Sequence, residues 1–278
     1  AVVPGRLFAE FVKKINVDSI ELSHFDEKRM KIRYKDSESS INCLPEGEFP
    51  IIKKIENAKK YKITGKNLKD LINKVSFSVS SDDSRPVLKG VLFEIDGNEI
   101  TAVAIDGYRL AIRKQKVDIN REINFTATSK AIAEVIKLID EETENVEINV
   151  GERLLSFNIN GYSFISRLIE GEFVNFNKTL PETSAQKVVV STRDLINTIE
   201  RVSLLISESF STPVRCYFNE LNVIFTCATA QGRSTETFNT KLEGENFEIG
   251  LNSHYLLDVL KAIEDENIQI LFIRLILY

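Results

Sequence analysis

The sequence predicts an α+β fold made of repeated domains, each carrying two helices on antiparallel sheets. Three observations along the 278 residues lead to this prediction. A short strand–turn–helix motif occurs five times, a second set of motifs returns at twice that spacing, and apolar residues alternate between a helical and a strand period. Because an amphipathic helix must cover its apolar face, each repeat is expected to be one helix packed on several strands.

The shorter repeat consists of an apolar strand end, a small or polar turn residue and an amphipathic helix. Its turn residues are Pro4, Thr64, Thr128, Ser191 and Asn252, spaced by about sixty residues. The last four have side chains that can accept a hydrogen bond from the first turn of a helix. The predicted helices are residues 5–15, 64–75, 128–139, 191–202 and 252–263, each with apolar side chains at helical spacing.

A second repeat has twice the period of the first. Gly47, in the segment Leu-Pro-Glu-Gly-Glu-Phe, is matched by Gly171 in Leu-Ile-Glu-Gly-Glu-Phe. Pro86, in Arg-Pro-Val, is likewise matched by Pro213 in Thr-Pro-Val. The displacement of about 125 residues is an ordinary domain size. The sequence therefore predicts domains of two half-units, with the two helices of a domain side by side on the sheet.

Between the helices, apolar and polar residues alternate as in half-buried strands. Segments 20–22, 30–34, 146–150 and 155–159 are expected to be antiparallel strands with one face in water. Asp96-Gly97-Asn98 and Asn160-Gly161 are predicted hairpin turns. The acidic segment 141–145 is expected to be a solvated loop and not a catalytic carboxylate cluster.

The composition is that of a globular protein, with 43% hydrophobic and 28% charged residues. No run of eighteen apolar residues is present, and residues 1–8 lack the features of a secretory signal. Cys43, Cys216 and Cys227 are odd in number and widely spaced, which indicates a reducing compartment and not a disulfide framework. A cytoplasmic protein that does not contact a membrane is expected.

The charge is distributed unevenly along the chain. The formal net charge is −5, yet the five predicted helices contain eleven Lys and Arg against six Asp and Glu. This distribution indicates that the helices face a polyanion while the rest of the surface repels it. The alternative is that these are ordinary solvated helix faces, since the last two helices are neutral by the same count.

Patterns that would indicate an enzyme are incomplete. Thr64-Gly65-Lys66 resembles the end of a phosphate-binding loop but lacks the upstream glycine and the following Ser or Thr. Ser184 and Lys187 have a Ser-x-x-Lys spacing without the companion motifs. The two histidines, His24 and His254, have no partner at metal-ligand spacing. We therefore expect no catalytic residue, no metal ion and no cofactor.

Four segments carry a more specific signal. They are SSDDSRPVLKGVLFE at 80–94, VAIDGYRLA at 103–111, RLIEGEF at 167–173 and IGLNSHYLLDVL at 249–260. In this order, and placed on the repeat described above, they resemble the bacterial β sliding clamp family, the processivity subunit of DNA polymerase III. The resemblance runs through nearly the whole chain.

The resemblance implies the DNA-clamp fold, in which two three-domain subunits form a head-to-tail ring of six domains around double-stranded DNA. This chain would form a pseudo-symmetric arc of such a homodimeric, non-catalytic ring, with helices inside and sheets outside. Basic helices would then meet phosphates without reading bases. The side chains expected to face DNA are Arg6, Lys13, Lys14, Lys66, Lys74, Arg85, Lys130 and Lys137. Ile41, Leu205 and Ile206 resemble the family's subunit interface, although a core position explains their apolar character equally well.

The resemblance also implies a pocket for short peptides of polymerases, the clamp loader and repair proteins. Its residues here would be Leu88, Ile105, Gly107, Tyr108, Arg109, Leu110, Val174, Lys178 and Thr179. Gly107 would permit a tight turn, Leu88, Leu110 and Val174 would bury apolar side chains, and Arg109 would bind carbonyl or carboxylate oxygens. A plain hairpin is the alternative interpretation of the turn. Several family members have His and Pro where Tyr108 and Val174 stand, so peptide preference would differ.

Set against the family pattern, residues 1–60 would be the second half of domain I, 61–184 domain II and 185–278 domain III. After residue 270 the family continues with further strands, whereas here residues 271–278 follow at once. Either the chain is shortened relative to the family, or residues are missing before 273–278, which would then belong to a closing strand. The functional alternative to a clamp is a peptide-binding scaffold that does not encircle DNA.

Overall fold

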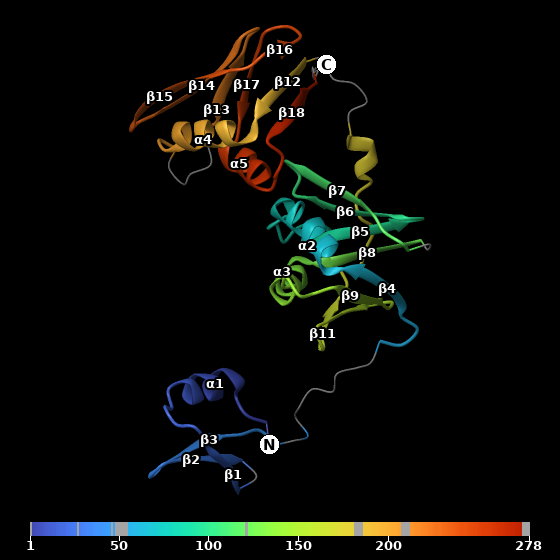
Figure 1. The fold of residues 1–278 in the computed structure, drawn as a ribbon, viewed down its shortest axis with the longest axis vertical. Coiled ribbons are helices and arrows are strands. Elements are labelled where there is room, and N and C mark those ends of the chain that lie inside the picture. The colour runs from blue at the N-terminus through green and yellow to red at the C-terminus, as the bar shows by residue number, and fades with distance from the viewer. Residues whose placement is uncertain are drawn as a thin grey trace. The chain divides into compact units, whose positions relative to one another are not determined.

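The computed structural model describes residues 2–26, 28–45, 47, 55–119, 122–180, 186–206 and 212–273. The chain divides into two compact units, residues 1–54 and 55–278, and each is described here by itself. The described residues have an α+β fold with five α-helices (Figure 1). All strand pairs formed by these residues are antiparallel, as expected.

The described residues of the N-terminal unit form one helix and one three-stranded sheet. Its elements are α1 (Gly5–Lys13), β1 (Glu21–Asp26), β2 (Arg29–Tyr34) and β3 (Ser37–Asn42), in the sheet order β1-β2-β3. The predicted burial of the helix's apolar face is only partly met in α1: Phe8, Phe11 and Val12 are half-buried, none of its residues is fully buried, and Leu7 is 53% exposed. A single small sheet offers too little surface to cover the helix, and Phe11 meets Tyr34 only edge-on, with ring centroids 6.1 Å apart.

The first part of the second unit, residues 59–179, is called the central module below. Its elements are β4 (Lys59–Thr64), α2 (Gly65–Asn73), the short 3-10 turns η2 (Ser76–Ser78) and η3 (Pro86–Leu88), β5 (Gly90–Asp96), β6 (Glu99–Ile105), β7 (Leu110–Lys116), β8 (Ile123–Thr128), α3 (Ser129–Leu138), β9 (Asn145–Val150), β10 (Leu154–Ile159), β11 (Tyr162–Arg167) and the 3-10 turn η4 (Phe176–Thr179). The strands form two four-stranded sheets, ordered β7-β6-β5-β8 and β11-β10-β9-β4. One core, which includes Leu68, Phe93, Ile132 and Phe157, joins both sheets to α2 and α3.

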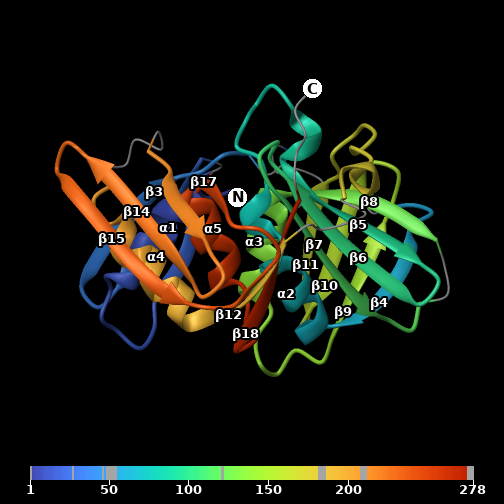
Figure 2. The ribbon, with the colours of Figure 1, turned by 90° about the horizontal axis from the view of Figure 1, so that it is seen from above.

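Residues 186–272 of the same unit are called the C-terminal module. Its elements are β12 (Gln186–Ser191), α4 (Thr192–Ser203), β13 (Val214–Phe218), β14 (Asn222–Thr229), β15 (Gly232–Asn239), β16 (Leu242–Glu243), β17 (Phe247–Leu251), α5 (Ser253–Lys261) and β18 (Asn267–Phe272). The sheets are ordered β16-β12-β18 and β15-β14-β13-β17. A separate core includes Leu195, Ile199, Phe225 and Leu260. Figure 2 shows α4 and α5 next to each other, as the sequence predicts for the helices of one domain.

The predicted helix starts are confirmed by their capping bonds. Thr64, Thr128, Ser191 and Asn252 each accept a backbone N–H through the side chain, and α2 to α5 begin at the next residue. These bonds satisfy N–H groups that have no partner inside the helix. All five helices end within two residues of the predicted position.

The predicted hairpin turns are also confirmed. Gly97 lies between β5 and β6 with φ +56°, and Asn160 and Gly161 join β10 to β11 with φ +47° and +82°. Two consecutive positive φ values match the twist of the flanking strands, which is why Asn-Gly favours this turn. At the end of the chain, β18 pairs with β12 without interruption through Phe272, while residues 274–278 lie outside the described residues.

All three cysteines are free and buried, in agreement with the prediction that they form no disulfide framework. Burial raises the pKa of the Cys216 thiol to about 12. Because the thiolate is the reactive form, Cys216 is a packing residue of the second core and not a nucleophile.

Candidate functional site

The turn between β6 and β7 is held by one carboxylate. Asp106 Oδ1 accepts the backbone N–H of Tyr108 at 2.9 Å and that of Arg109 at 3.0 Å. Gly107 lies between them with φ +96°, a conformation that a residue with a Cβ adopts only under strain. The tight turn predicted at Gly107 is therefore confirmed, and it leaves the Tyr108 side chain 85% exposed.

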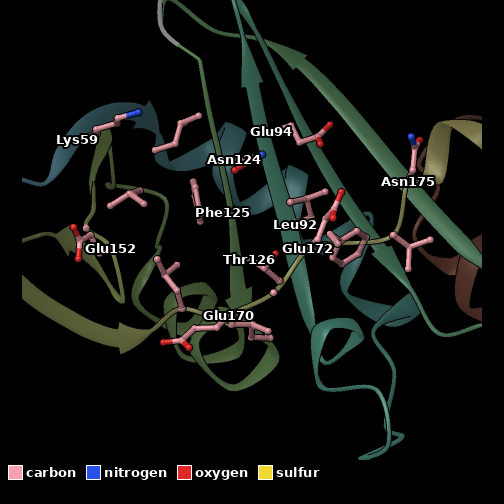
Figure 3. Close-up of a pocket in the computed structure, with 18 of the residues that line it drawn as sticks. Lys59, Leu92, Glu94, Asn124, Phe125, Thr126, Glu152, Glu170, Glu172 and Asn175 are labelled. Atoms are coloured by element: carbon pink, nitrogen blue, oxygen red, sulfur yellow. The ribbon is translucent and has the colours of Figure 1, made fainter.

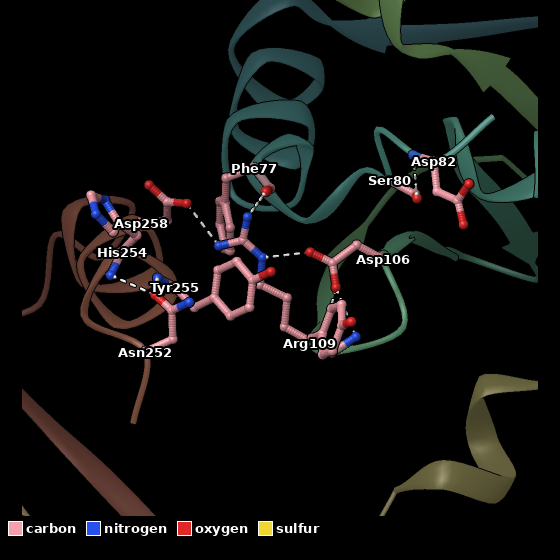
Figure 4. Close-up of polar contacts among 10 residues, drawn as sticks. Phe77, Ser80, Asp82, Asp106, Arg109, Asn252, His254, Tyr255 and Asp258 are labelled. Carbon is pink, nitrogen blue, oxygen red and sulfur yellow. Dashed lines mark hydrogen bonds and ion pairs between the residues drawn. The ribbon is translucent and has the colours of Figure 1, made fainter. Parts of the chain in front are cut away.

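Arg109 is the most connected side chain of this region (Figure 4). Its Nε donates to Asp106 Oδ2 at 2.9 Å, its Nη1 to Asp258 Oδ2 at 2.7 Å and its Nη2 to the Phe77 carbonyl oxygen at 2.5 Å. The guanidinium carbon lies 4.3 Å from the centre of the Tyr255 ring and 5.5 Å from that of Phe77. Burial acts to lower the pKa of Arg109, but the hydrogen bonds to Asp258 and Asp106 outweigh it, so that pKa is raised and the charge is secure.

Three residues that complete this arrangement were not identified from the sequence. Phe77 belongs to η2, while Tyr255 and Asp258 belong to α5, so the Arg109 side chain joins the central and C-terminal modules. Tyr255 and Asp258 are three residues apart and therefore share one face of α5. That spacing was the available signal, but only the fold shows which arginine the face meets.

Of the other predicted pocket residues, some pack inside the central module and some are exposed on its surface. Ile105 and Leu110 are paired at the ends of β6 and β7, and Leu110 packs against a small core that contains Phe176. Leu88 is buried at 3% exposure, so its side chain is part of the module's interior. Lys178 and Thr179 are exposed on η4, where the Thr179 hydroxyl donates to the Phe176 carbonyl oxygen at 2.7 Å.

Val174 lines a cavity of about 780 Å³ in the central module, which is drawn in Figure 3. Of the nine predicted pocket residues, it alone lines this cavity. Leu92 and Phe125 are among the apolar side chains around it, and Figure 3 shows Glu94 and Glu172 at its border. The structure thus brings Gly107 to Leu110 together at one turn, and Leu110 packs against the small core of Phe176, a residue that lines the cavity together with Val174.

The basic side chains predicted to face DNA differ in how free they are. Lys66 and Lys130 are exposed, whereas Arg6 pairs with Glu10 at 3.1 Å and Lys137 with Glu134 at 2.7 Å. Lys13 and Lys14, at the end of α1, are exposed, and so is Arg85, whose Nη1 would lie 3.5 Å from a Cβ placed on Gly107. Their role in DNA binding stays a prediction.

Lys74 is the exception, because its side chain is only 16% exposed. It donates to the carbonyl oxygen of Ala262, the residue that caps the C-terminus of α5, and pairs with Glu264 at 2.9 Å. A cation at that end of a helix meets carbonyl groups that have no partner inside the helix. Lys74 therefore contributes to the contact between the two modules.

Replacing Lys74 by methionine is expected to loosen the last turn of α5. The loss of the charged hydrogen bond costs about 1.5 kcal/mol, and amide exchange in residues 259–264 should become faster. Lys66→Met is the matched control, since Lys66 is exposed and lies on α2, the helix whose C-terminus Lys74 caps. Equal exchange of these amides in the two variants would contradict the assignment.

The residues expected at a subunit interface are mostly inside their own units. Ile41 is 6% exposed, and Leu205 and Ile206 are half-buried against the core of the C-terminal module. This placement fits the core position that the sequence left open. Leu204, which was not predicted to lie at an interface, is 79% exposed and is the apolar side chain that the end of α4 presents to solvent.

Of the two sequence patterns considered for catalysis, one has a structural role and the other includes a residue outside those that the structure describes. Thr64 caps α2, and Ser184 falls outside the described residues. Within the described residues, no group of three or more His, Cys, Asp or Glu side chains could hold a metal ion. None of the helices that the structure describes is both long and apolar enough to cross a membrane.

Comparisons with known proteins agree on one family. The model of the DNA polymerase III beta subunit central domain matches residues 62–175, and that of its C-terminal domain matches residues 177–275. The beta sliding clamp of Bacillus subtilis (strain 168) is 30% identical over 276 residues, which is 98% of this chain and 73% of that protein. A beta sliding clamp of Staphylococcus epidermidis is 30% identical over 274 residues, with the same coverage.

Solved structures give the same result. The sliding clamp of Bacillus subtilis superimposes with a TM-score of 0.92 at 29% identity, covering 98% of this chain and 73% of that one. The Pseudomonas aeruginosa clamp bound to griselimycin gives a TM-score of 0.88 at 26% identity, with 97% and 74% covered. The recurring capped helices, the antiparallel sheets and these matches lead to one conclusion: the chain belongs to the bacterial β sliding clamp family, the β subunit of DNA polymerase III.

Proposed function

We propose that this chain is a processivity factor, part of a ring that encircles double-stranded DNA and tethers the replicative polymerase, the clamp loader and repair proteins. The observation that carries the proposal is the likeness to a sliding clamp over 98% of the chain at a TM-score of 0.92. A ring retains DNA by topology, so its inner wall needs only a modest positive bias. A dense basic patch would hold phosphates tightly and oppose sliding.

The assembly we propose is a homodimer of head-to-tail subunits. Residues 1–60 would supply the second half of clamp domain I, 61–184 domain II and 185–278 domain III. The separate cores of the central and C-terminal modules support the division, as do the spans of the two matching family models. The exposed Leu204 would add apolar surface at the contact between subunits.

The peptide site we propose is centred on the Asp106–Arg109 turn and α5. The exposed Tyr108 lies near Tyr255, with ring centroids 6.1 Å apart, which gives an aromatic surface for apolar peptide side chains. Griselimycin bound in the Pseudomonas aeruginosa clamp supports the presence of a ligand site in this family. The chain itself would be non-catalytic and would act in the cytoplasm.

Primer extension tests this function. With the polymerase III core and clamp loader of the same bacterium, and trap DNA that limits each polymerase to one binding event, the chain is expected to lengthen the products. The physical reason is that a tethered polymerase rebinds at high effective concentration before it diffuses away. Products of unchanged length in the presence of the chain would contradict the proposal.

A peptide-binding scaffold that does not encircle DNA is the second candidate. It is favoured by the ion pairs of Arg6, Lys74 and Lys137, which occupy basic side chains expected to face phosphates. Such a scaffold would bind griselimycin without lengthening the products of primer extension. The two functions are therefore separated by the same assay.

A further inference from the structure

The contacts of Arg109 assign it a role different from the one that the family resemblance implies. We propose that Arg109 and Asp258 form a tie that sets α5 against the Asp106–Arg109 turn, and that this tie positions the ligand surface without binding the ligand directly. Asp258 is then a positioning residue for capture at the site. The inference rests on the proposed peptide-binding function for its consequence, but the tie itself is tested separately below.

The guanidinium of Arg109 already has hydrogen-bond acceptors on all three of its nitrogens. An arginine has five N–H donors, and three nitrogens of Arg109 already donate to Asp106, Asp258 and the Phe77 carbonyl. Tyr255 and Phe77 lie over the group within 4.3 and 5.5 Å. Its side chain is only 19% exposed. Two N–H groups, one on Nη1 and one on Nη2, are left by these bonds, but the low exposure and the two neighbouring rings restrict the access of a peptide oxygen to them.

The two carboxylates that accept from Arg109 lie far apart in the chain. Asp106 shapes the turn through two backbone N–H groups, while Asp258 lies on α5, 149 residues after Arg109. Figure 4 shows Arg109 between Asp106 on one side and Asp258 and Tyr255 on the other. One cation therefore fixes both the conformation of the turn and its distance from α5. Charge-assisted hydrogen bonds of this kind are among the stronger polar contacts in proteins.

Tyr255 connects the tie to the ligand surface. Tyr255 is one helical turn from Asp258 on α5, and its ring covers the Arg109 guanidinium while lying near the ring of Tyr108. If α5 moves away, the two tyrosines separate and the aromatic surface opens. Preorganisation of such a surface increases affinity, because the free energy of ordering it is not subtracted from the binding free energy.

The experiment compares Asp258→Asn with Glu200→Gln. Glu200 is a well-matched control, because it pairs with Lys261 of α5 at 2.7 Å and is 45% exposed, while Asp258 pairs at 2.7 Å and is 46% exposed. The Glu200 pair lies within the C-terminal module and does not involve the turn. The probe is griselimycin, with affinity measured by titration calorimetry on the whole chain.

We expect Asp258→Asn to bind griselimycin about tenfold more weakly, the effect of losing one charged hydrogen bond. Amide exchange at Tyr108 and Arg109, whose N–H groups Asp106 accepts, should become faster in the absence of ligand. Glu200→Gln should leave both readouts unchanged. Asp258→Glu keeps the negative charge and should therefore recover part of the affinity. If Asp258 contributed only by packing, restoring its charge would not recover affinity.

Three results would overturn the proposal. Unchanged exchange at the turn in Asp258→Asn would show that the tie does not hold it. Unchanged affinity with faster exchange would show that the tie does not position the ligand surface. Tighter binding would show that Asp258 competes with the ligand for Arg109. If the wild-type chain does not bind griselimycin, the proposed ligand site fails, whereas the exchange comparison still decides whether the tie exists.

Discussion

Replacement of Arg109 by methionine is expected to remove griselimycin binding and to destabilise the second unit. Methionine keeps much of the side-chain volume but leaves Asp106, whose side chain is 12% exposed, without its cation. Breaking a largely buried pair by removing one partner costs about 3 kcal/mol, since the remaining charge is poorly solvated. The turn would relax away from α5, and affinity should fall by about 100-fold or more.

The matched control is Arg113→Met. Arg113 lies on β7, the strand that follows Arg109, and pairs with Asp70 at 2.8 Å, but its side chain is 44% exposed. An exposed pair contributes less than about 1 kcal/mol, and the turn is not part of it. Urea unfolding and calorimetric titration measure both effects. Equal losses of stability and affinity in the two variants would refute the role given to Arg109.

Replacement of Gly90 by alanine is expected to cause the largest loss of stability for a single added methyl group. Gly90 begins β5 and pairs with Thr128, and a Cβ there would overlap the Ala127 carbonyl oxygen and lie 2.6 Å from Ile169 Cδ1. The carbonyl belongs to the pairing of β8 with β5 and cannot move aside without breaking it. Overpacking of this kind costs about 3 kcal/mol, measured as the free energy of unfolding in urea.

Gly250→Ala is the control for this variant. Gly250 is also a strand glycine of the second unit, but its added Cβ would meet Pro213 Cβ at 3.4 Å, an ordinary contact. We expect a change of less than about 0.5 kcal/mol, or a slight gain from the lower entropy of the unfolded chain. A stability loss at Gly250 as large as that at Gly90 would show that backbone entropy and not the close approach governs both sites.

The sequence was most informative where structure is decided locally. Thr64, Thr128, Ser191 and Asn252 mark helix starts because a capping side chain acts on N–H groups two or three residues away. Asn160-Gly161 marks a turn because few other residues adopt its backbone angles. These effects need no knowledge of the tertiary fold, so helix ends and hairpins could be predicted.

The site was less predictable because it depends on contacts between distant segments. Gly107 and Tyr108 could be placed on a turn, but the partner of Arg109 lies 149 residues away on α5. Lys74 looked like a solvated basic residue until the fold placed it at the end of α5. The apolar face of α1 gives the opposite case, since its periodicity is clear and the unit that contains it still leaves that face at most half-buried. Periodicity shows that a face needs a cover and does not show what supplies it.

The central claim is that this chain retains DNA by encircling it, and linearisation of a loaded plasmid tests it most directly. The chain is loaded onto a nicked circular plasmid by the clamp loader with ATP, separated from free protein, and then treated with a restriction enzyme that cuts once. We expect the chain to stay with the circle at moderate salt and to leave after the cut, because a ring slides off a free end. Retention that survives linearisation, or no retention on the circle, would contradict the account.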